Sequence, residues 1–339
     1  MHEYTGVIHV HSTCSDGSGT VPEIIRAGQE CGLDFLILTD HNTLRAAQEG
    51  FDGWHQDMLM IVGEEVSARC GHCLAIGTDA HIPHRQSGRS IIDAIREQQG
   101  LSFLAHPHGV YRPVLKRRDH TWKDWDIPPF TGMELWSYMF DWAADFHYSR
   151  FLSFYRNPNA RIKGPFPQTL ATWDRLCRSA RVVAIGGVDA HAKRYSPFPL
   201  VVFPYRMLFN TVRTHVLSQR PLGRSNGAED RASMLHALGE GSCYLAWDGL
   251  APASGFRFSA AGNPQLGMGC ETAFQSPVAF EVNVPLPADV TIYRDGHPFY
   301  RSSGCTRLGF TAHTPGVFRV EARRSGLPWI YSNPIYLRA

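Results

Sequence analysis

Residues 6–11 read GVIHVH, a short apolar run that ends in two histidines. Such a run predicts a buried β-strand. Residues 35–41, FLILTDH, repeat the arrangement, because polar side chains again close an apolar run. Between them, residues 21–31 have the spacing of a helix, with Thr20 as a plausible N-cap and Gly32 as the stop. A strand, a helix and a second strand in this order predict parallel pairing of the two strands.

The alternation of strands and helices continues to about residue 250. Further strands are predicted at residues 58–62, 73–76, 101–105, 132–136 and 182–185, and further helices at residues 90–99, 169–179 and 230–238. At least seven strand signals in about 245 residues match the size of a β/α barrel. A doubly wound open sheet is the alternative. No GxGxxG follows the first strand, so a dinucleotide-binding fold has no support.

After residue 249 the pattern changes to alternating polar and apolar residues. Such segments occur at residues 255–258, 278–282, 290–293 and 317–322, and turn signals separate them. No helical pattern accompanies them, so an appended β-sandwich is predicted. The expected division is a barrel over residues 1–250 and an accessory β-sandwich over residues 251–339.

The composition narrows the class of protein. The 339 residues are 43% hydrophobic and 19% charged, which is globular and excludes a disordered chain. No run approaches the ~20 apolar residues that span a bilayer, and the first residues do not resemble a signal peptide. The net charge of +2 does not indicate a polyanion-binding surface. Eight scattered cysteines fit a reduced protein, so a cytoplasmic location is expected.

Polar side chains gather at the predicted strand ends. Six strand positions each carry His, Asp or Glu, nearly always at the carboxyl end; the residues are His9, His11, Asp40, His41, Glu64, Glu65, His72, His106, His108, Asp189 and His191. Asp16 follows the first strand closely. A single histidine is more often a hydrogen-bonded surface or core residue than a ligand. Six coincident placements at the face where barrels hold their active sites instead predict a polynuclear metal site.

As a set, these motifs resemble the PHP (polymerase and histidinol phosphatase) metallohydrolases. The matching stretches are HVHS with SDG at residues 9–17, LTDHN at 38–42, GEEVS at 63–67, GH at 71–72, AHP at 105–107 and VDAH at 188–191. They cover about residues 5–195 in the family's order. Residues 63–72 and the closing PWIYSNPIY at 328–336 are also similar to stand-alone PHP proteins with an appended β domain, among them carbaryl-hydrolase-like members.

The resemblance implies a distorted seven-stranded β/α barrel, followed here by the small β-sandwich, with two to three divalent ions (Zn, Mn or Fe). The implied ligands fall into three sets. The first is His9, His11, Glu65 and Asp189, the second is Glu65, His72 and His106, and the third is Asp16, His41 and His191. Glu65 would bridge the first two. Glu64 competes for that role, but Glu65 is followed by Val66 and Ser67, as the family glutamate is followed by an apolar residue and Ser or Thr.

This ligand set predicts hydrolysis without a separate nucleophile. A metal-bridging hydroxide, held by Glu65 and Asp189, would attack phosphorus or a carbonyl carbon. The GxSxG elbow of serine hydrolases is absent, which argues against acyl-enzyme chemistry.

The choice of substrate must come from groups other than the ligands. Arg112 and Arg194 closely follow two ligand motifs and are expected to grip a phosphate, whereas His108 could face the cavity or lie on an exposed loop. A phosphoesterase acting on a small phosphomonoester or nucleotide is therefore expected, with nucleic acid bound only as a nucleotide or short oligonucleotide. A carboxylester, amide or carbamate hydrolase is the alternative, and a non-catalytic binding protein is the second alternative.

Overall fold

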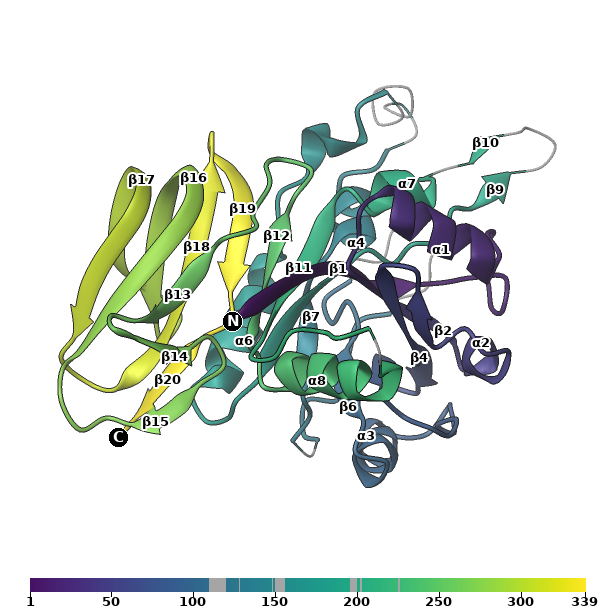
Figure 1. The fold of residues 1–339 in the computed structure, drawn as a ribbon, viewed down its shortest axis with the longest axis horizontal. Helices are drawn as coiled ribbons and strands as arrows, with labels where there is room; N and C mark the ends of the chain where they lie inside the picture. Colours follow the sequence, from purple (N-terminus) through teal and green to yellow (C-terminus); the bar gives the residue numbers. More distant parts are fainter. Residues whose placement is uncertain are drawn as a thin grey trace.

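The computed structural model describes residues 1–109, 120–127, 129–147, 149, 156–195, 200–201, 203–224 and 226–339. Its strands form one large mixed sheet and a separate two-stranded ribbon. The sheet passes from a mixed α/β region into an all-β region at the C-terminus (Figure 1). None of the helices in the described residues is long and apolar enough to cross a membrane.

Seven strands carry the motifs of the α/β region. They are β1 (His2–Val10), β2 (Phe35–His41), β4 (Met58–Ala68), β5 (Gly71–Ile76), β6 (Leu101–Leu104), β7 (Gly132–Ser137) and β8 (Val183–Gly187). In this order each pairs with the next. The segment after β8 returns to β1, where the amide of His11 donates to the carbonyl of Ala190 at 2.9 Å and the amide of Ala190 donates to the carbonyl of His9 at 3.1 Å. The carboxyl ends of β1 and β8 therefore lie side by side.

The direction of β5 departs from the sequence prediction. β1, β2 and β4 run parallel, and so do β6, β7 and β8, but β5 is antiparallel to both β4 and β6. The cause is the short connection over residues 69–70, because a parallel crossover needs about a dozen residues. The turn places His72, at the start of β5, opposite Ser67 near the end of β4. His72 thus reaches the same edge as the carboxyl ends of the parallel strands.

Helices lie around the outside of these strands (Figure 1). The longer ones are α1 (Val21–Glu30), α3 (Gly88–Glu97), α6 (Pro167–Cys177) and α8 (Gly227–Gly239), and the shorter ones are α2 (Arg45–Gln48), α4 (Tyr138–Ala144), α7 (Tyr205–Leu208) and the 3₁₀ turn η3 (Pro158–Arg161). Each long helix lies within a few residues of its predicted range. α1 begins as the sequence indicates, because Thr20 and Glu23 form a reciprocal capping box and Pro22 lies in the first turn.

The remaining strands of the α/β region lie outside this series of seven. They are β3 (Gly53–His55), β11 (Val212–Ser218), β12 (Cys243–Trp247) and the two-stranded ribbon of β9 (Arg194–Tyr195) and β10 (Leu200–Val201). β11 was not expected from the sequence. It pairs antiparallel with both β1 and β12, and three consecutive polar residues (Arg213, Thr214 and His215) interrupt it, so it lacks the apolar run that marks its neighbours.

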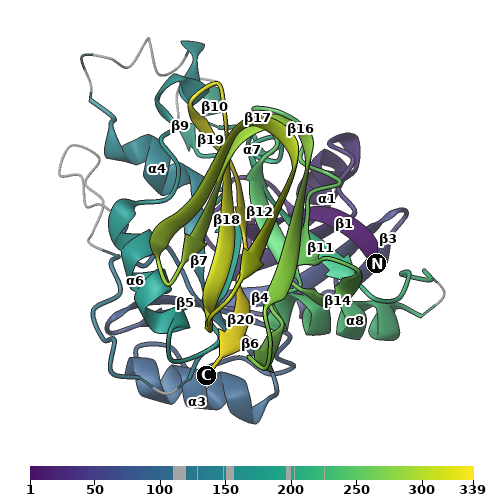
Figure 2. The same cartoon turned by 90° about the vertical axis from the view of Figure 1, so that its left-hand side faces the viewer.

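The C-terminal region is all-β, as predicted. Its strands are β13 (Arg257–Ala260), β14 (Asn263–Gly267), β15 (Glu271–Ala273), β16 (Val278–Arg294), β17 (His297–Ala312), β18 (Gly316–Arg324), β19 (Leu327–Ser332) and β20 (Ile335–Arg338). One hydrophobic cluster fills this region and also takes in Leu217, Tyr244 and Ala246 of β11 and β12, and the long strands β16, β17 and β18 face the viewer in Figure 2. The region is nevertheless joined to the rest of the sheet, because β19 pairs antiparallel with β12.

Candidate metal centre

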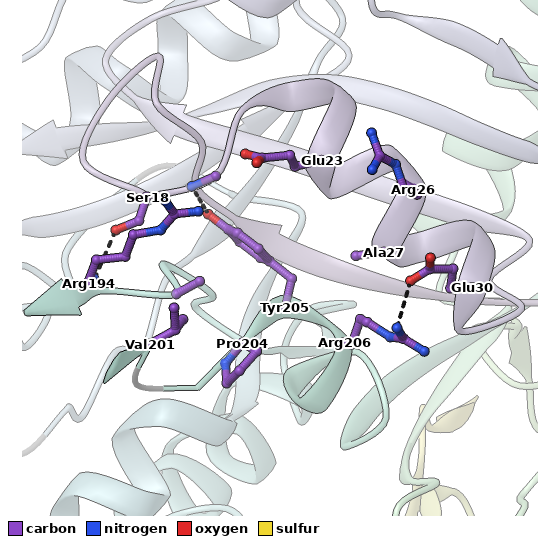
Figure 3. A pocket seen from close by; sticks show the side chains of 12 residues that line it. Ser18, Glu23, Arg26, Ala27, Glu30, Arg194, Val201, Pro204, Tyr205 and Arg206 are labelled. Carbon is purple, nitrogen blue, oxygen red and sulfur yellow. Dashed lines mark hydrogen bonds and ion pairs between the residues drawn. The ribbon is translucent and has the colours of Figure 1, made fainter. Parts of the chain in front are cut away.

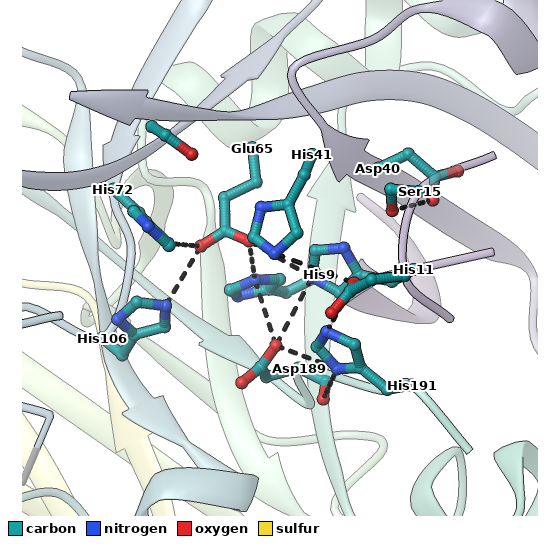
Figure 4. Close-up of polar contacts among 12 residues, drawn as sticks. His9, His11, Ser15, Asp40, His41, Glu65, His72, His106, Asp189 and His191 are labelled. Atoms are coloured by element: carbon teal, nitrogen blue, oxygen red, sulfur yellow. Dashed lines mark hydrogen bonds and ion pairs between the residues drawn. The ribbon is translucent and has the colours of Figure 1, made fainter. Parts of the chain in front are cut away.

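Nine side chains converge at the carboxyl edge of the parallel strands (Figure 4). They form four overlapping groups whose possible ligand atoms lie within 4.8 Å of one another. The groups are His9, His11 and Asp189; His9, Glu65 and His106; His41, Glu65 and His72; and His11, Asp16, His41 and His191. These are the nine residues that the resemblance implied as ligands, and together they form a set of imidazole and carboxylate donors suited to divalent transition metals.

Glu65 lies at the middle of the cluster, and its two oxygens face different imidazoles. Oε2 lies 3.2 Å from Nε2 of both His9 and His11. Oε1 lies 2.7 Å from Nδ1 of His72 and 3.0 Å from Nε2 of His106. Because one carboxylate joins two sets of nitrogen atoms, Glu65 has the geometry of a bridging ligand.

Asp189 is the second buried carboxylate of the nine residues. Its Oδ1 lies 3.5 Å from Nε2 of His9 and 3.4 Å from Nε2 of His11. Asp189 follows β8, and the hydrogen bonds between β1 and the segment after β8 hold it beside the two histidines. Two histidine nitrogens and one oxygen each from Glu65 and Asp189 therefore point into one space.

The third set of residues is more exposed. Asp16 Oδ1 lies 3.0 Å from His191 Nε2 and 3.8 Å from His41 Nε2, while the Asp16 side chain is 49% exposed. Nδ1 of His191 lies 3.0 Å from the carbonyl of Asp189, which leaves Nε2 directed at Asp16. The ammonium of Lys193 contacts Asp16 as well, at 2.9 Å from Oδ2.

The backbone is strained where three of these side chains leave their strands. His9 has φ 71°, His106 has φ 30° and Asp189 has φ 49°, values that residues other than glycine rarely adopt. At His9 the pairing of β1 with β2 also shifts register between Ile8 and Val10. Such strain of about 1–3 kcal/mol per residue persists only where the surroundings enforce it, and it clusters at functional sites.

Several buried nitrogens at the centre have no hydrogen-bond partner. They include Nε2 of His9, Nε2 of His11 and Nδ1 of His41, all of which lie 3.1–3.2 Å from Glu65 Oε2 without hydrogen-bond geometry. An unsatisfied buried polar atom costs about 1–3 kcal/mol. A metal ion is bound by lone pairs that several ligands direct toward it. The positions of these nitrogens and of Glu65 therefore fit a divalent metal ion.

The electrostatics of the protein without ions agree with this fit. Burial acts to raise the pKa of Glu65, but the surrounding imidazoles outweigh it and hold that pKa well below its usual value. Burial acts to lower the pKa of His9, but Glu65, Glu134 and Asp189 outweigh it and hold that pKa well above its usual value. Both shifts arise because carboxylates and imidazoles are crowded together, and a divalent cation among them would be attracted to the same carboxylates.

Two further carboxylates shape the site without belonging to the nine. Asp40 is buried and accepts hydrogen bonds from the amide and hydroxyl of Ser12, at 2.7 and 2.6 Å, and from the hydroxyl of Ser15. It thereby holds the loop that carries Asp16. Glu134, on β7, lies 3.0 Å from Nδ1 of His9 and was not predicted as a site residue. The only sequence signal for it is a lone acidic residue inside an apolar strand.

His120 is a further histidine at the site that the sequence reasoning missed. Its ring centroid lies 4.7 Å from that of His72 and 6.0 Å from that of His106. Burial, together with the charges of His72 and His106, lowers its pKa to about 4. It follows no strand motif, so its position beside His72 and His106 could not be predicted from the sequence.

The predicted substrate-binding residues are placed differently. Arg112 lies outside the described residues. Arg194 is exposed and lines a pocket of about 330 Å³ with Glu23 and Tyr205 (Figure 3), and none of the nine residues lines this pocket. His108 is half-buried, stacks on Trp125 and lies 3.2 Å from the hydroxyl of Thr169.

No protein-family model matches the sequence. An uncharacterized protein of Methanocaldococcus jannaschii is 28% identical over 94 residues, which are 27% of this chain and 53% of that protein. The phosphoribosyl 1,2-cyclic phosphate 1,2-diphosphodiesterase of Eggerthella lenta is 35% identical over 85 residues, 22% of this chain and 32% of that protein. The chain thus spans about half of the first relative's length and about a third of the second's.

Three solved structures are similar at low identity. A two-domain protein from Bacteroides vulgatus, described as containing a predicted PHP-like metal-dependent phosphoesterase, covers 98% of this chain and 95% of its own, at 14% identity and a TM-score of 0.44. PsfC from Pseudomonas syringae covers 74% and 94%, at 13% identity and a TM-score of 0.43. An amidohydrolase from Chromobacterium violaceum covers 55% and 87%, at 14% identity and a TM-score of 0.33.

Proposed function

We propose that this chain is a metal-dependent hydrolase of phosphoric esters that acts on a small phosphorylated molecule. The observation that carries the proposal is the position of Glu65, whose two oxygens face separate sets of imidazoles while Asp189 lies opposite. Under this proposal the strands β1, β2 and β4–β8 are the distorted seven-stranded barrel. Residues 1–250 supply the catalytic centre, and residues 251–339 form an accessory domain without ligands.

The proposed centre takes two to three divalent ions. His9, His11, Glu65 and Asp189 would hold the first, Glu65, His72 and His106 the second, and Asp16, His41 and His191 the third. Such ions supply a water of lowered pKa and neutralise charge on the oxygens of the reacting group. The protein's own contribution is to hold its donors rigidly, through the strained backbone at His9, His106 and Asp189.

A phosphate substrate is supported by charge at the rim of the centre. Lys193 places an ammonium 2.9 Å from Asp16 Oδ2, beside the most exposed of the three sets. The side chain is 40% exposed, so it can also face an incoming anion. The curated relative from Eggerthella lenta is named for the hydrolysis of a phosphoric ester, which adds to this support.

One observation favours the alternative, a hydrolase of carboxylesters, amides or carbamates. Arg194, which was expected to bind phosphate, lines a pocket with Glu23 and Tyr205. None of the nine residues of the metal centre lines that pocket. A neutral ester gains little from cations beyond the metals. The two substrate classes therefore have to be separated by experiment.

The test compares three chromogenic substrates on protein reconstituted with Mn²⁺ or Zn²⁺. These are p-nitrophenyl phosphate, bis(p-nitrophenyl) phosphate and p-nitrophenyl acetate. The proposal expects turnover of a phosphate ester that disappears with a chelator and returns with the metal. Turnover of the acetate alone would establish the alternative, and metal-independent turnover of any substrate would contradict both.

A further inference from the structure

A buried carboxylate on β7 contacts two members of the cluster at once. Glu134 is 1% exposed, and its Oε1 lies 3.0 Å from Nδ1 of His9. Its Oε2 accepts a hydrogen bond from the backbone amide of His106 at 2.6 Å. His9 belongs to the first ligand set and His106 to the second, so one side chain is tied to both.

The fold makes room for this carboxylate. Gly187, on the neighbouring strand β8, has no side chain, and a Cβ there would lie 1.8 Å from Glu134 Oε1. The pairing of β7 with β8 also shifts register between Glu134 and Trp136. Only glycine at position 187 therefore allows the carboxylate to reach His9.

The contact with His9 decides which ring nitrogen is available. A carboxylate oxygen is an acceptor, so its place beside Nδ1 favours the tautomer with the proton on Nδ1 and the lone pair on Nε2. Nε2 is the nitrogen that lies 3.2 Å from Glu65 Oε2 and 3.5 Å from Asp189 Oδ1. A carboxylate in this position fixes both the tautomer and the orientation of the ring.

The contact with His106 holds the backbone rather than the ring. His106 has φ 30°, a conformation that needs support from its surroundings. The hydrogen bond from its amide to Glu134 supplies such support, and Nε2 of the same residue lies 3.0 Å from Glu65 Oε1.

We propose that Glu134 is a positioning residue for both ion sites: it sets the tautomer of His9 and holds the backbone of His106, and so couples the two ligand sets. The proposal rests on the metal centre proposed above. It assigns Glu134 no contact with substrate.

Glu134→Gln tests the tautomer directly, because the side chain keeps its size. The amide oxygen can still accept from His106, but the amide nitrogen then faces Nδ1 of His9 and requires that atom to be an acceptor, which moves the proton to Nε2. Apparent affinity for Zn²⁺ or Mn²⁺, measured by competition with a chromogenic chelator, should fall about 10–100-fold. Imidazole ¹⁵N spectra of the ion-loaded proteins should show a coordinated Nε2 for His9 in the wild type and lose that signal in the variant.

Glu64→Gln is the matched control. Glu64 is equally buried and accepts from the amide of Ile82 at 2.6 Å, and its Oε2 lies 2.7 Å from Nδ1 of His81, but neither partner belongs to the nine residues. Its variant should bind metal as the wild type does. Wild-type metal affinity and an unchanged His9 signal in Glu134→Gln would overturn the proposal, as would an equal loss of affinity in both variants.

A second measurement keeps the two proposals separate. If the wild-type chain bound no divalent ion, the proposed metal centre would fail, but amide hydrogen exchange at His106 would still test the role of Glu134. Glu134→Ala should speed that exchange at least tenfold, and Glu134→Gln should leave it nearly unchanged. Equal protection in all three proteins would exclude a hold on the His106 backbone.

Discussion

Glu64 and Glu65 are neighbours on β4, and their carboxylates lie on opposite sides of that strand. The oxygens of Glu65 lie among the imidazoles of the centre, while those of Glu64 contact His81 and the amide of Ile82. Successive side chains of a strand point to opposite faces, so only one member of the pair can belong to the centre.

This relationship gives the first prediction. Glu65→Gln should lower kcat for a phosphate ester by at least about 10³-fold, because it removes charge from the carboxylate shared by two ligand sets. Glu64→Gln should keep kcat within a few-fold of the wild type and lower the free energy of unfolding by about 1–3 kcal/mol, since it removes the charge from a buried carboxylate that accepts from the amide of Ile82. Steady-state kinetics and urea unfolding of the two variants check both expectations. Equal activity of the two variants would contradict the assignment.

The second prediction concerns His9 and Asp189. His9→Ala or Asp189→Ala should abolish hydrolysis and leave the secondary structure intact, because the aliphatic core of the strands does not depend on the centre. Circular dichroism and thermal unfolding of the metal-free proteins, measured beside activity, separate loss of chemistry from loss of fold. Near-wild-type activity in either variant would count against the ligand set.

Lys193 leads to a third prediction. Its ammonium lies 2.9 Å from Asp16 Oδ2 and competes with a cation for that carboxylate. An exposed ion pair contributes about 0.2–1 kcal/mol, so Lys193→Met should raise the affinity of the most weakly bound ion by up to a few-fold. The same change should raise KM for a phosphate ester, because a positive charge at the rim is lost. Arg45→Met, which breaks the exposed pair of Arg45 and Glu49, is the control and should change neither quantity.

A fourth prediction tests how β1 is attached to the C-terminal region. Glu3 lies 3.0 Å from His215 Nδ1 and accepts from the hydroxyl of Tyr244 at 2.6 Å and from Arg257 at 2.7 Å. Burial acts to raise the pKa of Glu3, but these contacts outweigh it and lower the pKa from 4.5 to about 2. The folded state therefore favours the charged carboxylate.

A lowered carboxyl pKa stabilises the fold above the unfolded value and loses that contribution as the pH falls. The contribution of Glu3, about 3 kcal/mol, should be complete above pH 4.5 and disappear between pH 4.5 and pH 2. Glu3→Gln should accordingly lower stability at pH 7 and flatten the acid limb of the unfolding curve. A variant with the wild-type pH dependence would show that this network does not contribute.

The convergence of the nine residues could be predicted from the sequence, because each belongs to a motif at or within a few residues of a strand end, while their role as metal ligands stays a prediction. It was not sufficient for the direction of β5, which depends on the length of one turn over residues 69–70. Glu134 escaped notice because one acidic residue in an apolar strand has no motif. Its role depends on the pairing of β7 with β8 and on the missing side chain of Gly187.

Lys193 immediately precedes β9 and Arg194 begins it, yet the two side chains have different surroundings, which the sequence alone does not reveal. Lys193 reaches Asp16, whereas Arg194 lines the pocket beside Tyr205. The all-β character of the described residues after 250 could be inferred from alternating segments and turn signals, but the pairing of β12 with β19 could not, because it joins residues more than eighty positions apart.

The most direct test of the central claim is the metal content of the protein. Protein purified without chelator, dialysed against buffer with traces of Zn²⁺, Mn²⁺ and Fe²⁺, should hold two to three divalent ions per chain by inductively coupled plasma mass spectrometry. Glu65→Ala, which removes the shared carboxylate, should hold at most one. A wild-type chain with one ion or none, or a Glu65→Ala variant with the same content as the wild type, would contradict a polynuclear centre built around Glu65.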